Sequence, residues 1–135
     1  MKVLVTGSRV YNDYDKVKDA ILESGASIIV HGNAKGADEL AKKVALAFGL
    51  DERRYPANWD KYGKGAGPKR NQQMLDMEHT TEEPIDLVLA FPVDGSIGTY
   101  DMISRAQKAG IEVKIYGKYV PLDWCPKHHI EDDCK

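Results

Sequence analysis

The sequence has few of the features that mark secreted or membrane-spanning proteins. Its 135 residues include two cysteines, both within the last eleven positions, so a disulfide framework for the whole chain is excluded. No run approaches the roughly 18 consecutive apolar residues that span a bilayer. The first residues, 1–5, lead straight into an apolar strand without a signal-peptide pattern. We therefore expect a cytoplasmic protein with no membrane partner.

Excess charge of one sign is also missing. The formal net charge is −2, and aromatic residues make up 8% of the chain. These values argue against a strongly basic surface for binding nucleic acid, so we do not expect nucleic acid as a partner. The 42% apolar and 30% charged content is typical of a globular domain, and the length suits one such domain with its own core.

Apolar runs and helical patterns alternate along the chain. Runs of apolar residues predict five strands, at 2–6, 28–30, 52–55, 86–91 and 111–116. Pro92 ends the fourth strand, because proline cannot donate a backbone hydrogen bond. The fifth strand alternates apolar and polar residues, as an edge strand does. Helical spacing predicts four helices between them, at 15–24, 37–48, 68–77 and 99–109. This order predicts an α/β fold, a Rossmann-like three-layer sandwich with a mostly parallel sheet.

Glycine-bearing loops follow three of these strands, at residues 7–9, 31–38 and 92–99. The carboxyl ends of parallel strands share one edge of a sheet, and ligands bind beyond that edge. Residues 92–99 lead into a helix, whose free backbone N–H groups and positive dipole end favour a phosphate or carboxylate. The three loops together predict an anion site.

Individual side chains in these loops leave alternatives open. Arg9 either binds phosphate or carboxylate or lies in a polar turn facing solvent. Asp38 either accepts a hydrogen bond from a sugar hydroxyl or interacts with the N-terminus of its own helix. Gly36 is expected to let the backbone approach a ligand. His31 is expected to be a packed, hydrogen-bonded side chain rather than a general base.

A long polar loop is predicted at 57–67. Trp59 and Tyr62 would stack on a base, shield the pocket from water, or simply hold the loop in place. The cations Lys69 and Arg70 follow at the start of a helix, where positive charge is unfavourable unless an anion binds there.

The last residues contain zinc-ligand residue types in an unusual spacing, at Cys125, His128, His129 and Cys134. This spacing matches no standard structural zinc site. We expect a domain over 1–117 and a short irregular tail over 118–135, with no metal and no cofactor.

Several segments together resemble the YspA, YpsA-related branch of the SLOG superfamily, which are small Rossmann-like proteins of bacteria and their phages. The resemblance spans about residues 1–116, and the segments that carry it are 7–9, 31–38, 56–59, 65–71, 90–92 and 98–99. It implies a five-stranded sheet in the order 3-2-1-4-5 and a nucleotide or nucleotide-derived ligand. It also implies self-association as a homodimer or a higher oligomer.

Enzymatic cousins of this branch, the LOG-type phosphoribohydrolases, carry an R-K-x-x-M motif and a P-G-G-x-G-T-x-x-E loop. Residues 70–74 resemble the first motif, with Asn71 in place of lysine. Residues 92–99 are longer than the second, and Met102 takes the position of its glutamate, with Asp101 one residue earlier. One residue turns a helical side chain by about 100°, so Asp101 is expected to point elsewhere.

The leading hypothesis is a protein that binds a nucleotide or a related phosphate-bearing molecule, as a sensor or a sequestering module. The residues expected to contact the ligand are Gly7, Ser8, Arg9, Gly32, Asn33, Gly36, Asp38, Trp59, Arg70, Asn71, Pro92, Gly95, Gly98 and Thr99. The alternative is a hydrolase of N-glycosidic bonds in nucleoside monophosphates, with Arg70 and Asp101 as its catalytic candidates. An adaptor that uses the basic segment 61–70 is a third, weaker hypothesis.

Overall fold

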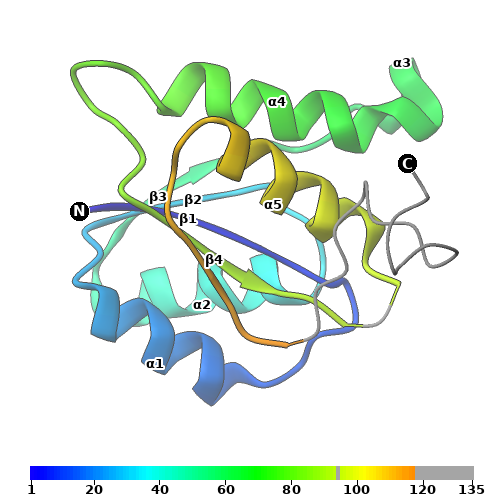
Figure 1. Ribbon diagram of the computed structural model, residues 1–135. Helices are drawn as coiled ribbons and strands as arrows, with labels where there is room; N and C mark the ends of the chain where they lie inside the picture. Colours follow the sequence, from blue (N-terminus) through cyan, green and yellow to red (C-terminus); the bar gives the residue numbers. More distant parts are fainter. Residues whose placement is uncertain (94, 118–135) are drawn as a thin grey trace, which may run out of the picture.

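A five-stranded sheet forms the centre of the structure, a computed structural model that describes residues 1–93 and 95–117. The strands are β1 (Lys2–Gly7), β2 (Ile28–His31), β3 (Asp51–Arg54), β4 (Leu87–Phe91) and β5 (Val113–Ile115). Their order is β3-β2-β1-β4-β5, and every neighbouring pair is parallel. The sequence-based strand order is therefore confirmed, and β5 lies at an edge as expected (Figure 1).

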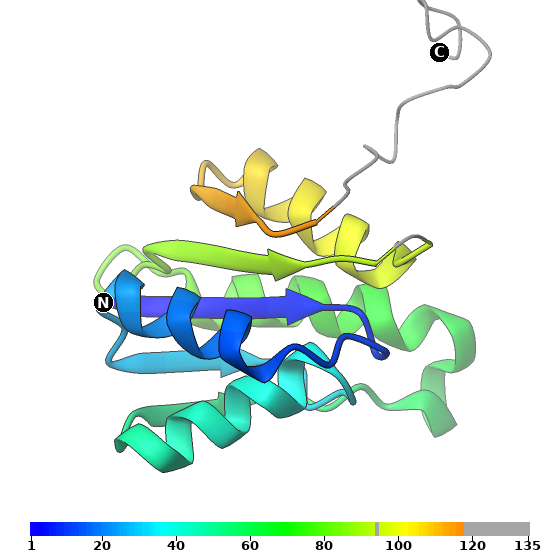
Figure 2. The same cartoon turned by 90° about the horizontal axis from the view of Figure 1, so that it is seen from below.

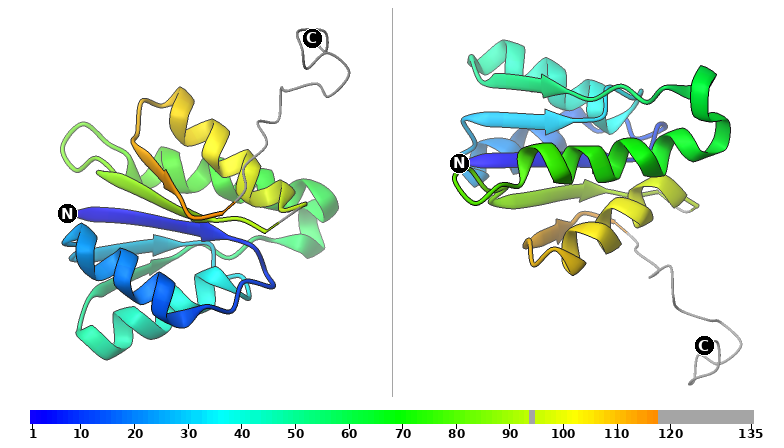
Figure 3. Two further views of the ribbon diagram at one scale, coloured as in Figure 1. Left: turned by 60° about the horizontal axis from the view of Figure 1, so that its bottom comes forward. Right: turned by 90° about the horizontal axis from the view of Figure 1, so that it is seen from above.

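Helices cover both faces of the sheet and make the predicted three layers. They are α1 (Tyr14–Ser24), α2 (Ala37–Phe48), α3 (Trp59–Tyr62), α4 (Ala66–Glu78) and α5 (Ile97–Lys108). In Figure 1, α4 and α5 lie above the sheet and α1 and α2 below it. Figure 2 and the right panel of Figure 3 show the strands pointing toward α3 and the first turns of α4 and α5, so these elements gather at the carboxyl edge.

The central strand β1 is buried on both faces because its apolar residues run without interruption. Val3 and Val5 pack into a cluster with α1 and α2, whereas Leu4 packs into a second cluster with α4 and α5. All three side chains are fully buried. Alternate residues of one strand thus contribute to two cores, which explains why the sequence shows a continuous apolar run there.

The prediction of an irregular loop over 57–67 is wrong. This segment forms α3, then the 3-10 turn η1 (Gly63–Gly65), and α4 already begins at Ala66. The side chain of Asn58 caps α3 by accepting a hydrogen bond from Lys61 N at 3.1 Å. Pro68 is therefore the third residue of α4 rather than its first, a position that also needs no backbone donor.

A charged network closes the opposite edge of the sheet. Lys2, only 3% exposed, lies 3.1 Å from Glu78 Oε1, and Arg53 donates to the same carboxylate oxygen at 2.7 Å. The Tyr55 hydroxyl also donates to Glu78. Burial alone would raise the pKa of Glu78, but the hydrogen bonds from Tyr55, Arg53 and Lys2 together lower it. This network ties the start of β1 to the end of α4.

Within residues 1–93 and 95–117, none of the helices combines the length and the apolar character needed to cross a bilayer. The tail residues Cys125, His128, His129 and Cys134 lie outside the described residues. The domain boundary at 117 remains a prediction.

Candidate functional site

A cavity of about 330 Å³ opens at the carboxyl edge of the sheet. Its walls come from the end of β1, the start of α2, α3, one face of α4 and the first turn of α5. The predicted ligand-binding residues that line it are Gly7, Ser8, Arg9, Asp38, Trp59, Arg70, Asn71, Gly95, Gly98 and Thr99. Segments that are far apart in the sequence thus meet at one concave site, as the arrangement of strand ends predicted.

The first turn of α5 presents its backbone to this cavity. Ser96 precedes the helix but does not cap it with its side chain, because its Oγ accepts a hydrogen bond from Val93 N at 3.0 Å. Gly98 and Thr99 belong to the first turn, where backbone N–H groups have no carbonyl partner within the helix. An anion in the cavity would meet these donors and the positive end of the helix dipole.

Arg70 is held rigidly at the floor of the site. Its Nη1 donates to Gly32 O at 2.5 Å and to Tyr55 O at 3.3 Å, and its Nε donates to Asn71 Oδ1 at 3.1 Å. Burial lowers the pKa of Arg70, the nearby charge of Asp38 opposes this shift, and Arg9 adds to it. A guanidinium nevertheless stays protonated at neutral pH, so Arg70 is a fixed positive charge.

Arg9 supplies a second cation at the mouth of the cavity. Its guanidinium carbon lies 5.1 Å from the centroid of the Trp59 ring, a distance typical of a cation–π contact. Both side chains are exposed. Arg9 and Arg70 therefore have different roles: Arg70 is half-buried and held by hydrogen bonds, while Arg9 is exposed and can adjust to a ligand.

Asp38 is a buried carboxylate in the same wall. Its Oδ2 accepts hydrogen bonds from Gly32 N at 3.0 Å and Ala34 N at 3.3 Å, so it orders the loop before its own helix. Its other oxygen, Oδ1, is the one buried side-chain polar atom of the described residues that has no hydrogen-bond partner. Burial raises the pKa of Asp38, and the charge of Arg70 together with the two amide hydrogen bonds opposes this only in part.

His31 is packed and hydrogen-bonded, as expected. It is fully buried, its Nδ1 accepts from Asn33 N at 2.9 Å, and its Nε2 lies 2.5 Å from Glu52 Oε2. Because Nδ1 is an acceptor, Nε2 carries the proton that faces Glu52. Both ring nitrogens are occupied, which leaves neither for chemistry in the cavity.

Four predicted ligand-binding residues do not line the cavity: Gly32, Asn33, Gly36 and Pro92. At Gly36, with φ +77°, an added Cβ would lie 2.1 Å from Ser8 O. The expectation that Gly36 lets the backbone approach a ligand is therefore corrected: it lets the α2 start approach the loop after β1, where Ala37 N donates to Ser8 O at 3.1 Å. At Gly32 a Cβ would lie 2.4 Å from Arg70 Nη1, so this glycine makes room for the guanidinium.

The two remaining residues have local roles. Asn33 holds a positive φ of 56° in the turn after β2, a conformation that asparagine adopts more readily than most residues. Pro92 directly follows the end of β4 at Phe91, as its missing donor predicted.

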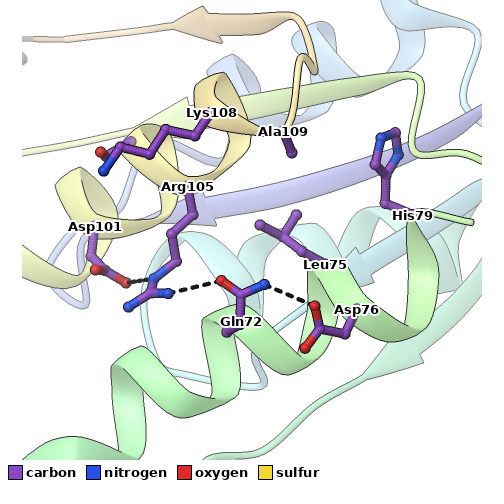
Figure 4. Close-up of a pocket in the computed structure, with 9 residues that line it drawn as sticks. Gln72, Leu75, Asp76, His79, Asp101, Arg105, Lys108 and Ala109 are labelled. Atoms are coloured by element: carbon purple, nitrogen blue, oxygen red, sulfur yellow. Dashed lines mark hydrogen bonds and ion pairs between the residues drawn. The ribbon is translucent and has the colours of Figure 1, made fainter.

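Asp101 faces a different depression, a groove of about 730 Å³ between α4 and α5 (Figure 4). Its Oδ2 accepts from Asn71 Nδ2 at 3.0 Å and from Arg105 Nε at 2.8 Å, and Arg105 also donates to Gln72 Oε1 at 2.8 Å. Met102, at the position of the expected glutamate, is fully buried in the core. Among the residues that the structure describes, Asp38 is thus the one carboxylate that lines the cavity.

The lining residues that were not anticipated from the sequence are Val5, Thr6, Ala34, Gly67, Met74, Ser96 and Ile97. Two of them carry a signal in hindsight. Gly67 and Met74 share a helical face with Arg70 and Asn71, at the spacing i, i+3, i+4 and i+7. Helical spacing counted from Arg70 and Asn71 along this face of α4 would have identified Gly67 and Met74 as lining residues.

Comparison with known proteins agrees with this architecture. The sequence model of the YspA, cpYpsA-related SLOG family matches residues 1–62, which include the loops after β1 and β2 and α3. The Gene 61 protein of Mycobacterium phage D29 is 36% identical over 126 residues, covering 86% of this chain and 96% of the phage protein. The chain belongs to this SLOG family.

A solved structure has a similar fold at lower sequence identity. DNA processing protein A (DprA) from Streptococcus pneumoniae superposes with a TM-score of 0.50 over 84% of this chain, at 20% identity. This chain spans 58% of the length of the DprA chain, so the likeness concerns the fold alone. Membership of the SLOG family points in general terms to a nucleotide-derived ligand.

Proposed function

We propose that this protein binds a nucleotide or nucleotide-derived, phosphate-bearing small molecule in the cavity at the carboxyl edge of the sheet. It would act as a sensor or a sequestering module. The observation that carries the proposal is the meeting, around one cavity, of the first turn of α5 with Arg9 and Arg70. Family membership supports the nucleotide-derived character of the ligand.

The phosphate would lie against the backbone N–H groups of Gly98 and Thr99, where the helix dipole is positive. Arg70 is fixed by carbonyl oxygens and needs no reorganisation to face a negative charge. Arg9 would close over the phosphate from the mouth of the cavity. The volume of about 330 Å³ lies at the low end of the usual size of ligand pockets, which favours a single nucleotide over a larger ligand.

Trp59 offers an aromatic face next to this anion site. Stacking of a base on an aromatic side chain contributes about 1–3 kcal/mol and depends little on the identity of the base. The proposal therefore places the base of the ligand near Trp59, with the phosphate farther inside.

The alternative of N-glycosidic hydrolysis receives no support from the geometry. The candidate base Asp101 faces the α4–α5 groove and is engaged by Asn71 and Arg105. Met102 is buried in the core and supplies no carboxylate. A binding function needs neither residue.

Isothermal titration calorimetry tests the proposal. The wild-type protein is titrated with the four ribonucleoside 5′-monophosphates, cyclic nucleotides and ADP-ribose, and each mixture is then analysed by chromatography for free base. We expect saturable binding of at least one nucleotide without release of base. A folded protein that binds none of these compounds would contradict the proposal.

A pair of charge-removing variants locates the site. Arg9→Ala should weaken binding about 10-fold, which corresponds to one charge-assisted hydrogen bond at a solvated position. Lys43→Ala removes the same charge from an exposed position on α2 that does not line the cavity, so its affinity should equal that of the wild type. Equal losses in both variants would indicate nonspecific attraction and refute the assignment of the cavity.

A further inference from the structure

We propose that Asp38 recognises a sugar hydroxyl of the ligand, so that the cavity distinguishes ribonucleotides from deoxyribonucleotides; this inference rests on the proposed function. The chemical group assigned to Asp38 is an uncharged hydrogen-bond donor that lies next to a phosphate in the same molecule. A phosphorylated ribose has this combination. Inorganic phosphate has no sugar hydroxyl, and 2′-deoxyribose phosphate lacks the 2′-hydroxyl.

The unpartnered oxygen is the starting point. Asp38 is 5% exposed and lines the cavity, yet its Oδ1 accepts no hydrogen bond from any described residue. A buried polar atom without a partner is costly, and such atoms are rare in folded proteins. A donor from the ligand would satisfy this atom and would also offset the desolvation of the carboxylate.

The charges around the cavity decide which part of the ligand approaches Asp38. A phosphate beside this carboxylate would place two negative charges together in a poorly hydrated site. The first turn of α5 and the two arginines offer the phosphate a favourable position instead. Asp38 can accept a hydrogen bond from an uncharged donor of the ligand without electrostatic repulsion.

Asp38 and Arg70 share one neighbour but remain separate. Gly32 N donates to Asp38 Oδ2, and Gly32 O accepts from Arg70 Nη1. In the described part of the chain no ion pair neutralises Asp38, although the charge of Arg70 is felt there. The carboxylate and the guanidinium are therefore both held by the backbone of the same residue, Gly32, and can bind the hydroxyl and the phosphate of one sugar phosphate.

Calorimetry with matched nucleotides tests this inference. The wild-type protein is titrated with adenosine 5′-monophosphate and with its 2′-deoxy and 3′-deoxy analogues, and likewise with the other bases if they bind. We expect the loss of one hydroxyl to weaken binding about 10- to 100-fold, as for a hydrogen bond to a charged group. The 2′-deoxy analogue should show this loss, whereas a loss confined to the 3′-deoxy analogue would overturn the claim that the cavity distinguishes ribonucleotides from deoxyribonucleotides.

The variant Asp38→Asn makes the comparison specific to this side chain. Its amide oxygen can still accept from Gly32 and Ala34, while its NH₂ group replaces Oδ1 and faces the ligand donor with another donor. The ratio of ribonucleotide to deoxyribonucleotide affinity should therefore fall to about one, the value for equal binding. Asp76→Asn is the matched control, because Asp76 lies in the α4–α5 groove, and it should keep the wild-type ratio.

The outcomes separate the two proposals. Nucleotide binding with no preference for the ribo form in the wild type would overturn this inference and leave the proposed function standing. A preference that survives in Asp38→Asn would do the same. A preference between adenosine and inosine monophosphate that disappears in Asp38→Asn would assign the donor to the base and also overturn it. Binding of no nucleotide would refute the proposed function itself.

Discussion

Replacement of Gly36 by alanine tests how the carboxyl edge is assembled. The backbone of Gly36 has φ +77° and ψ −126°, outside the left-handed region that other residues can enter, and an added Cβ would lie 2.1 Å from Ser8 O and 2.5 Å from the carbonyl carbon of Arg9. Both contacts are with backbone, so the loop after β1 must move and the hydrogen bond from Ala37 N to Ser8 O is lost.

The magnitude follows from these contacts. A backbone conformation that is nearly restricted to glycine costs an alanine about 1–3 kcal/mol, the lost hydrogen bond about 1 kcal/mol, and the forced displacement about 1–3 kcal/mol. We expect Gly36→Ala to lower the free energy of unfolding by about 4 kcal/mol, a large part of the stability of a typical domain. Urea denaturation measures this loss, provided that the slope of the transition stays equal to that of the wild type.

Gly25 provides the matched control. It has nearly the same φ, +76°, at the end of α1, but an added Cβ would meet nothing within 4 Å. Since its ψ of 23° places Gly25 in the left-handed region, which alanine enters at a modest cost, Gly25→Ala should cost only about 1 kcal/mol. If the two variants were destabilised equally, the close packing of the two loops would not be the reason for glycine at position 36.

Three further changes have defined outcomes. Lys2→Met removes a cation from Glu78 and should lower the free energy of unfolding by about 3 kcal/mol, at the lower end for a broken buried ion pair because Arg53 remains. Because the pKa of Glu78 lies below its ordinary 4.5, the stabilisation from this carboxylate is complete above 4.5 and is lost as the pH falls toward the folded value, so acid denaturation curves of the two proteins should converge. Burial and the hydrogen bond to Glu78 raise the pKa of Tyr55 to about 12, so a late tyrosine step in absorbance at alkaline pH should disappear in Tyr55→Phe, and an unchanged curve would refute it. Met102→Glu, which restores the expected glutamate, should unfold the protein or destabilise it by several kcal/mol rather than create hydrolase activity, because position 102 is fully buried.

The sequence predicted the sheet well because the central strands contain uninterrupted apolar runs, and a glycine or a proline follows close behind each of them. The same logic brought Gly7, Arg9, Gly98 and Thr99 to one edge, since parallel strands leave no other arrangement for the loops that follow them. The starts of helices that lie inside a glycine-rich polar segment were harder to predict.

The segment 57–67 shows why. Its glycines and polar residues indicate a loop, but the Asn58 cap and the tertiary contact of Trp59 with Arg9 favour a short helix. The role of Gly36 was hidden for a related reason. A glycine that admits a ligand and a glycine that admits a neighbouring backbone have the same sequence signature, and only the position of Ser8 distinguishes them. The unpartnered oxygen of Asp38 likewise depends on three-dimensional packing.

The most direct test of the central claim is a titration of ¹⁵N-labelled protein, followed by amide chemical shifts, with adenosine 5′-monophosphate and with inorganic phosphate. We predict that the amides of Gly98 and Thr99 shift most with both compounds and that the Trp59 indole shifts with the nucleotide. The amides of Gln72 and Arg105, in the α4–α5 groove, should stay in place. Saturable shifts centred on that groove, with Gly98 and Thr99 unchanged, would contradict the account.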